Sequence, residues 1–217
     1  MARRAFIMSA AALTAATALL LTGCGGDESS PDDIKGADTG SESPSAPPSA
    51  DAGRPDVSLP KDLRLVFDFD EPSDPDHSAA LADAANYIRA LNHGITEQAP
   101  DDPAYRFYSG AGAARYAQSQ IQEYVDGGWT VTGTDRYYDA KTSSSDASKA
   151  AKTVLVTFCE DQSKAYGKEV KSGKVHRTEP SLASYQKFSI LMASQKDSPV
   201  WRAQQITVAG KAEECRS

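Results

Sequence analysis

The sequence predicts an α+β domain in which two or three N-terminal helices pack on a curved antiparallel sheet of four to six strands. Apolar residues recur at helical spacing between residues 81 and 125, and most segments after Trp129 alternate between apolar and polar residues. The helical segments therefore come before most of the strands and do not alternate with them. This order is typical of a domain whose helices cover one face of an antiparallel sheet.

A short strand and a long helix are predicted first. Residues 63–69 alternate between apolar and polar side chains, which predicts the strand. Asp74 and Pro75 predict the start of the helix, because aspartate caps free amide groups and proline is tolerated at the first helical position. Apolar residues continue at helical spacing as far as Ile95, so this helix has one buried face.

A second pair of helix-start residues, Asp102 and Pro103, predicts a short helical turn. Another stretch with helical spacing covers residues 113–125. Gly127 and Gly128 are predicted to end it, because glycine readily adopts the left-handed conformation that closes many helices.

The elements that follow are predicted to be strands. They cover residues 129–138, 153–161, 182–193 and 200–208. An additional hairpin is predicted through residues 169–176, with its turn at Ser172 and Gly173. Residues 142–148 contain three consecutive serines and predict a loop between the first two of these strands.

The first residues of the chain predict a lipoprotein signal peptide over residues 1–23. Arg3 and Arg4 form a basic region, and the apolar stretch after them is too short and too rich in alanine for a confident membrane-spanning helix. Leu21-Thr22-Gly23-Cys24 matches a lipobox, in which the cysteine thiol is linked to diacylglycerol. An ordinary signal peptide with a chance cysteine is the alternative. We expect lipid on Cys24 to anchor the protein at the extracytoplasmic face of a bacterial cell membrane.

The export route stays open between two interpretations. Arg3-Arg4-Ala5-Phe6-Ile7 resembles a twin-arginine signal, which would mean export after folding. Two adjacent basic residues are also common at the start of any signal peptide.

The lipidated cysteine is followed by a predicted disordered tether, and together they cover residues 24–54. Between Gly25 and Arg54, Ile34 is the only large apolar residue, so this segment cannot bury enough surface to offset its ordering entropy. Residues 55–217 are enough for one domain with a sizeable core and too few for two of typical size.

Charge and cysteine content restrict the partners and the compartment. The net charge is −7 and the sequence contains no basic cluster, which argues against nucleic acid and anionic lipid headgroups as partners. Once Cys24 is lipidated, Cys159 and Cys215 are left, and two cysteines of an exported chain predict a disulfide. A catalytic thiol is the alternative, but neither cysteine lies in a CxxC motif.

The sequence contains none of the common catalytic, phosphate-binding or metal-binding motifs. Residues 110–115 begin like a dinucleotide fingerprint, but they lack its third glycine and predict a flexible joint between helices. The acidic residues between 68 and 76 are interrupted by Pro72 and Pro75, which predicts a solvated turn and not a calcium loop. We therefore expect no cofactor, no metal ion and no enzymatic activity.

Three local motifs accompany this order of elements. Asp135-Arg136-Tyr137-Tyr138 ends one predicted strand, Cys159-Glu160-Asp161-Gln162-Ser163 ends the next, and Trp201 opens the last strand before a terminal cysteine. This layout resembles actinobacterial lipoproteins with a nuclear transport factor 2-like (cystatin-like cone) domain. The resemblance covers residues 63–215 and implies a curved sheet that wraps a helix and leaves a cone-shaped interior.

The resemblance also implies which residues would line a pocket inside the cone. Related enzymes use an aspartate, a histidine or a tyrosine there, and a ligand carrier would need aromatic walls. The residues of these types are Tyr137, Phe158, Asp161, Tyr185, Trp201 and His93. Ordinary roles are open to them as well, such as capping a strand end for Asp161 and core packing for the tyrosines.

By elimination, we expect a membrane-tethered interaction module with an unknown protein partner. The alternative is a carrier or sensor that binds a small ligand in the cone, and an enzyme that uses the same cone ranks third. Members of the resembled family often pair through the open sheet face, which implies a homodimer.

Overall fold

The computed structural model describes residues 53–145 and 151–216. All of the described residues belong to one compact unit. The predicted signal peptide, the lipobox with Cys24 and nearly all of the predicted tether lie outside the described residues, as do residues 146–148 of the predicted loop. The first part of that loop, residues 142–145, was predicted wrongly, because it belongs to a strand. No helix within the described ranges is long and apolar enough to span a membrane.

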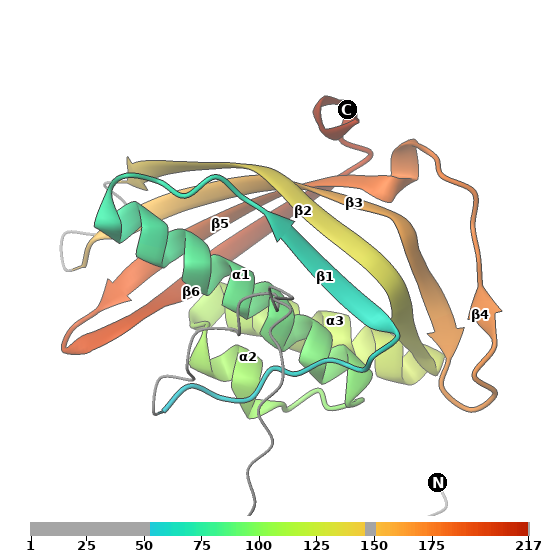
Figure 1. The fold of residues 1–217 in the computed structure, drawn as a ribbon. Helices are drawn as coiled ribbons and strands as arrows, with labels where there is room; N and C mark the ends of the chain where they lie inside the picture. Colours follow the sequence, from blue (N-terminus) through green and yellow to red (C-terminus); the bar gives the residue numbers. More distant parts are fainter. Residues whose placement is uncertain (1–52, 146–150, 217) are drawn as a thin grey trace, which may run out of the picture. The chain divides into compact units, whose positions relative to one another are not determined.

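The described unit has the predicted α+β architecture, in which three helices precede most of a six-stranded sheet (Figure 1). The helices are α1 (Pro75–Thr96), α2 (Pro103–Phe107) and α3 (Ala111–Gly127). Asp74 and Asp102 cap α1 and α2 as predicted, each accepting backbone amide hydrogen bonds through its carboxylate. Gly128 adopts the left-handed conformation that ends α3.

The strands of the sheet are β1 (Leu63–Asp68), β2 (Trp129–Ser145), β3 (Thr153–Glu169), β4 (Val175–His176), β5 (Tyr185–Gln195) and β6 (Ser198–Gly210). Their order across the sheet is β1-β2-β3-β5-β6, and β4 pairs with the far end of β3. Three strands of the sheet, β2, β3 and β6, are longer than the sequence predicts. The predicted strands ended at polar segments, near Tyr138 and Asp161. β2 and β3 continue beyond these residues, because polar side chains on the outer face do not interrupt the backbone hydrogen bonds between strands.

Two details of the sheet differ from the prediction. β1 pairs with β2 in parallel, so the sheet is mixed and the expectation of a wholly antiparallel sheet is wrong at this edge. All three helices lie between β1 and β2 in the chain, and such a long connection allows the second strand to run in the same direction as the first. The segment Leu182–Ser184, predicted as strand, is a 3-10 turn that leads into β5.

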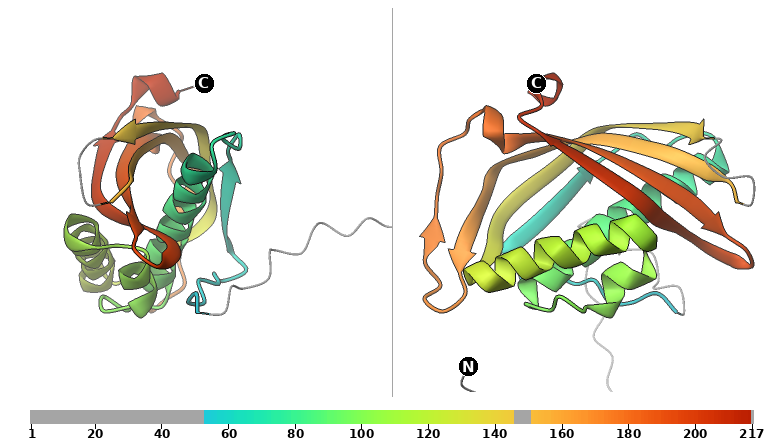
Figure 2. Two further views of the ribbon diagram at one scale, coloured as in Figure 1. Left: turned by 90° about the vertical axis from the view of Figure 1, so that its left-hand side faces the viewer. Right: turned by 180° about the vertical axis from the view of Figure 1, so that it is seen from behind.

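The sheet curves around the helices, and its concave face forms the core of the unit (Figure 2). An aromatic cluster joins four strands on this face. Tyr137 stacks on Phe67 with ring centroids 4.7 Å apart, Phe158 stacks on Phe188 at 5.1 Å, and the edge of Phe158 meets Tyr137 at 5.8 Å. These large rings hold β1, β2, β3 and β5 together beneath α1.

A glycine of β2 and a β-bulge of β3 shape the middle of this strand pair. Gly133 has a φ of +101°, and a Cβ at this position would lie 2.2 Å from the carbonyl oxygen of Lys164 on β3. The register then shifts between Thr134 and Arg136, so that Asp135 lies opposite two residues of β3. Bulges of this kind bend the strand that carries the extra residue. Here that strand is β3, at Gln162 and Ser163, while Asp135 keeps the alternation that places it on the same face of β2 as Tyr137.

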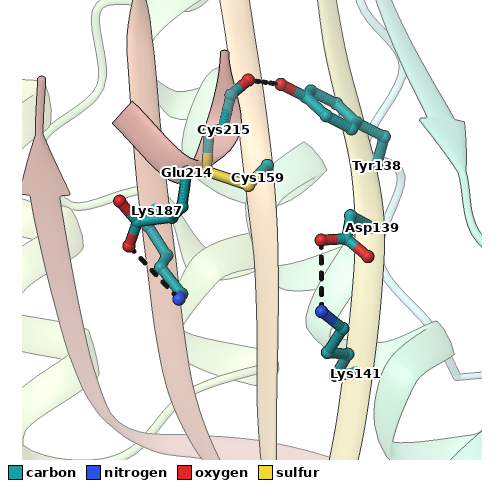
Figure 3. The surroundings of a disulfide bond; sticks show 7 residues. All are labelled: Tyr138, Asp139, Lys141, Cys159, Lys187, Glu214 and Cys215. Carbon is teal, nitrogen blue, oxygen red and sulfur yellow. Dashed lines mark hydrogen bonds and ion pairs between the residues drawn. A yellow bond between two sulfur atoms is a disulfide. The ribbon is translucent and has the colours of Figure 1, made fainter. Parts of the chain in front are cut away.

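The disulfide between Cys159 and Cys215 holds the C-terminus against the outer face of β3 (Figure 3). This is the pairing that the cysteine content predicts, and its Cα atoms are 5.4 Å apart. The hydroxyl of Tyr138 donates a hydrogen bond to the carbonyl of Cys215, and Lys187 pairs with Glu214 at 3.3 Å. These contacts form a small second core on the convex side of the sheet.

Arg54, within the segment predicted as tether, contacts the folded unit. Its guanidinium forms an ion pair with Asp83, a carboxylate that is buried in the middle of α1. The same carboxylate accepts a hydrogen bond of 2.8 Å from the backbone amide of Trp201. Asp83 therefore joins the start of the folded unit to α1 and β6, and its buried charge is paired.

Gly133→Ala should destabilise the protein by roughly 3 kcal/mol or more, because the new methyl group meets a backbone oxygen and the left-handed conformation strains alanine. Gly173→Ala is the matched control, since Gly173 has a φ of +70° but open space around it. Its cost should be about 1–2 kcal/mol. Urea denaturation of both variants measures the difference, and equal losses would contradict the close approach at Gly133.

Candidate functional site

A cavity of about 170 Å³ lies between the concave face of the sheet and helices α1 and α3. One side of it is apolar and comes mainly from α1 and the strands. The large apolar residues are Leu63, Ile88, Leu91, Ile95, Val131 and Phe188, and Ala165 adds a small one. Three tyrosines, Tyr116, Tyr124 and Tyr166, add aromatic rings with polar hydroxyls. Such a mixture of apolar wall and a few convergent polar groups is typical of a small-molecule site.

Two carboxyl groups and a tyrosine form the polar end of this cavity. Asp135 and Tyr137 are alternate residues of β2 and share its inner face, and Glu160 lies opposite Tyr137 on β3. All three are buried, with exposed fractions of 8%, 1% and 6% for Asp135, Tyr137 and Glu160. The Tyr137 hydroxyl donates a hydrogen bond of 3.2 Å to Oδ2 of Asp135, and the two carboxyl groups lie within hydrogen-bonding distance of each other.

The burial of this pair changes its protonation. Loss of hydration raises the pKa of Asp135 to about 7, and the neighbouring Asp161 acts in the same direction. Burial and the charge of Asp135 raise the pKa of Glu160 well above its usual range. Two carboxyl groups this close do not both ionise readily, so near neutral pH they share a proton and a single negative charge.

The tyrosines at this end remain hydrogen-bond donors. Burial raises the pKa of Tyr137 well above its ordinary value, and burial together with the charge of Glu160 raises the pKa of Tyr116 to about 12. The same two causes raise the pKa of Tyr124. The polar end therefore combines one carboxylate, one carboxylic acid and neutral phenols.

The protein supplies few donors to these carboxyl groups. Oδ1 of Asp135 receives no hydrogen bond from a donor group of the described residues. The amide of Asn92, which lines the cavity, donates to the carbonyl of Ile88 at 3.1 Å, and that of Gln162 donates to the carbonyl of Ala183 at 3.4 Å. No lysine, arginine or histidine lines the cavity within the described part of the chain.

The residues named from the resemblance are not brought together. Tyr137 lines the cavity, and Phe158 packs against its ring in the core beside it. Trp201 is buried at a different place, where its backbone contacts Asp83 of α1.

Asp161 and Tyr185 lie on the outer face of the sheet. They are paired neighbours on β3 and β5, and Tyr185 packs on the cluster around the disulfide. Asp161 accepts a hydrogen bond of 2.9 Å from the amide of Ser163, which is a capping role.

His93 is on α1 outside the cavity lining, where Nδ1 lies 2.9 Å from Oδ2 of Asp102. The other two histidines have separate partners: the ring of His77 contacts Thr142 and Ser144, and that of His176 contacts Glu169. The three rings do not form a shared site.

Asp135 and Glu160 are the functional candidates that the sequence reasoning missed. Both could have been found from the alternation of residues along a strand, because successive side chains point to opposite faces of a sheet. If Phe158 and Tyr137 face the interior, then Glu160 and Asp135 face it as well, and Asp161 faces outward. Strand alternation therefore identifies both carboxyl groups, and only the bulge of β3 opposite Asp135 could not be foreseen.

Within residues 53–145 and 151–216, no group of three or more His, Cys, Asp or Glu side chains is arranged to hold a metal ion. The geometry of the cavity fits an organic ligand that offers hydrogen-bond donors, and a carboxyl pair of this kind can also exchange a proton with it.

Comparisons with known proteins do not identify a relative from which function can be transferred. No family model matches the chain, and no curated protein matches it. Among solved structures, the crystal structure of the intermembrane space region of the chloroplast protein ARC6 is similar over 60% of this chain and 96% of that chain, with 11% identity and a TM-score of 0.34. A likeness this weak carries no argument about function.

The raised pKa of Asp135 predicts that the protein loses stability as the pH rises from about 4 to about 7. The ordinary value is 3.8, so within this interval the folded state binds more protons than the unfolded state. Since one pKa unit corresponds to about 1.4 kcal/mol, we expect a loss of a few kcal/mol. Urea denaturation at a series of pH values measures it.

The double variant Asp135→Asn, Glu160→Gln should remove most of this dependence on pH. Asp161→Asn is the matched control, since it removes one carboxylate from the next position of the same strand but on the outer face. A wild-type protein whose stability is constant or rises over this interval would contradict the buried acid pair.

Proposed function

We propose that this protein is an extracytoplasmic lipoprotein whose domain is a nuclear transport factor 2-like cone that binds a small ligand. The observation that carries the proposal is the cavity with Asp135 and Glu160 buried at its polar end. Binding without turnover is the simplest activity for this arrangement, because the described residues that line the cavity include no serine, cysteine, lysine or histidine.

The energetics of the pair support binding over a purely structural role. Two buried carboxyl groups destabilise the fold at neutral pH, and well-packed apolar residues at such positions are often equally or more stabilising. A carboxylate oxygen without a donor adds the cost of its lost hydration. A ligand that donates hydrogen bonds to these oxygens would offset both costs.

The size of the cavity limits the ligand to about one ring with a short substituent. An empty apolar cavity of about 150 Å³ is large enough to bind benzene, and this cavity measures about 170 Å³. We propose a ligand whose apolar part contacts the α1 side and whose polar group reaches Asp135 and Glu160.

This proposal replaces the interaction module that the sequence alone favours. The interaction module is expected only because the sequence shows no catalytic or binding motif, whereas a specific cavity supports the ligand-binding alternative. Lipid on Cys24 and the segment up to residue 52 would hold the cone near the extracytoplasmic face of the membrane.

A fragment library tested by methyl NMR should identify small molecules that shift the resonances of Ile88, Leu91 and Val131, which line the cavity. Gln120→Trp should weaken this binding about tenfold or more by filling the cavity from α3. Gln122→Trp, two residues further along the exposed side of the same helix, should leave it unchanged. The absence of any fragment in the cavity of a folded protein would contradict the proposed function.

Cys24→Ser should release the protein from the membrane, because the serine hydroxyl cannot form the thioether to diacylglycerol. Detergent phase partition of cell extracts measures this: the unaltered protein should enter the detergent phase and the variant the aqueous phase. Cys159→Ser tests whether loss of any cysteine has this effect, and that variant should remain in the detergent phase. A Cys24→Ser protein that still partitions with detergent would exclude the lipid anchor.

A further inference from the structure

We infer that the ligand of this cavity is a small protonated amine that takes the place of the proton shared by Asp135 and Glu160. The inference rests on the proposed function, since it names the chemical class of ligand for the same site. It is carried by the geometry of the donors and acceptors at the polar end of the cavity.

The first step is the imbalance between acceptors and donors. Asp135 and Glu160 together present four carboxyl oxygens in a buried space. The donors near them that the structure describes are the Tyr137 hydroxyl, which donates to Oδ2 of Asp135 and also lies near the other carboxyl group, and the backbone amide of Arg136. Oδ1 of Asp135 has no donor among the described residues. An ammonium group carries three N–H donors and no acceptor, so it complements this set of atoms better than a hydroxyl or a carboxylate does.

The second step is the charge of the surroundings. The titratable groups that face the pair are Tyr137 on β2 and Tyr116 and Tyr124 on α3, all neutral, and the nearby Asp161 on the outer face is acidic. No basic side chain lines the cavity within the described part of the chain. A cation therefore meets only neutral or negative groups, whereas an anion would meet a buried carboxylate without a compensating charge.

The third step is the aromatic content of the walls. Phe188 and the rings of Tyr116, Tyr124 and Tyr166 line the same cavity. Aromatic faces attract cations, and the attraction is stronger where water is excluded. The walls and the carboxyl pair thus favour the same class of ligand.

Binding also requires an exchange of protons. When the protonated amine enters, its N–H groups bond to both carboxyl groups, the shared proton leaves for the solvent, and the pair becomes fully ionised. The total charge of the site is therefore unchanged, because one ammonium cation enters and one proton leaves. The affinity for an amine should therefore rise with pH by up to about tenfold per pH unit while the pair still holds its proton.

The probe for this inference is benzylamine, which has one ring and a short arm and fits a cavity of about 170 Å³. Benzyl alcohol and benzoate have nearly the same shape and are neutral and anionic. Calorimetry on the mature chain carrying Cys24→Ser, from about pH 5.5 to about pH 8, compares the three compounds. Buffers with different ionisation enthalpies report the proton release, and methyl NMR of Ile88 and Val131 locates the ligand.

We expect benzylamine to bind about tenfold or more tightly than benzyl alcohol at the upper pH, benzoate to bind most weakly, and about one proton to leave per amine bound. Asp135→Asn and Glu160→Gln should remove both the preference for the amine and its dependence on pH. Both variants lose a buried ionisable group and should remain folded. Asp161→Asn, on the outer face, should retain both properties.

Two results would overturn the inference and leave the proposed function standing: equal binding of benzyl alcohol and benzylamine in the cavity, or amine binding that does not change with pH. If no compound of any charge shifts the cavity methyl groups, the proposed function fails together with the inference.

Discussion

The pairing of β2 with β3 is the constraint on which the rest of the structure depends. Both strands have 17 residues, and they are the longest elements of the sheet. The positive φ of Gly133 brings the backbone of β2 against Lys164, and a bulge of β3 opposite Asp135 adds to the curvature of the two strands around the helices. The same two strands carry the disulfide cluster on their convex side and the carboxyl pair on their concave side. Curvature, cavity and site are therefore consequences of one strand pair.

The two faces of this pair have opposite roles. Outside, the Cys159–Cys215 disulfide and the Tyr138 hydroxyl fasten the C-terminus to the sheet. Inside, Asp135 and Glu160 are buried at a cost to stability. The aromatic contacts among Tyr137, Phe158 and Phe188 hold the concave face together directly beside the acid pair. The aromatic core and the disulfide thus stabilise a fold whose stability the buried polar site lowers.

Much of the fold could be predicted because its signals are local. The two Asp-Pro starts of α1 and α2, the glycine that ends α3 and the turn at Gly173 each depend on a few neighbouring residues. The parallel pairing of β1 with β2 and the full length of β2 and β3 could not be predicted, because both depend on contacts between segments far apart in the sequence. Of the site, Tyr137 could be named, and Asp135 could have been named with it, because strand alternation places both residues on the same face of β2. The outward direction of Asp161 followed from strand alternation with Phe158, and Glu160 was the carboxylate in phase with the core.

The central claim is that Asp135 and Glu160 share a proton in the cavity at neutral pH. The most direct measurement is a ¹³C NMR titration of the side-chain carboxyl carbons, assigned with the Asp135→Asn and Glu160→Gln variants. The structure predicts that the resonances of the two groups change together, with Asp135 titrating near pH 7 and Glu160 well above the usual range of a glutamate. Two independent titrations near the ordinary values of 3.8 and 4.5 would contradict the buried pair and remove the basis for the ligand site.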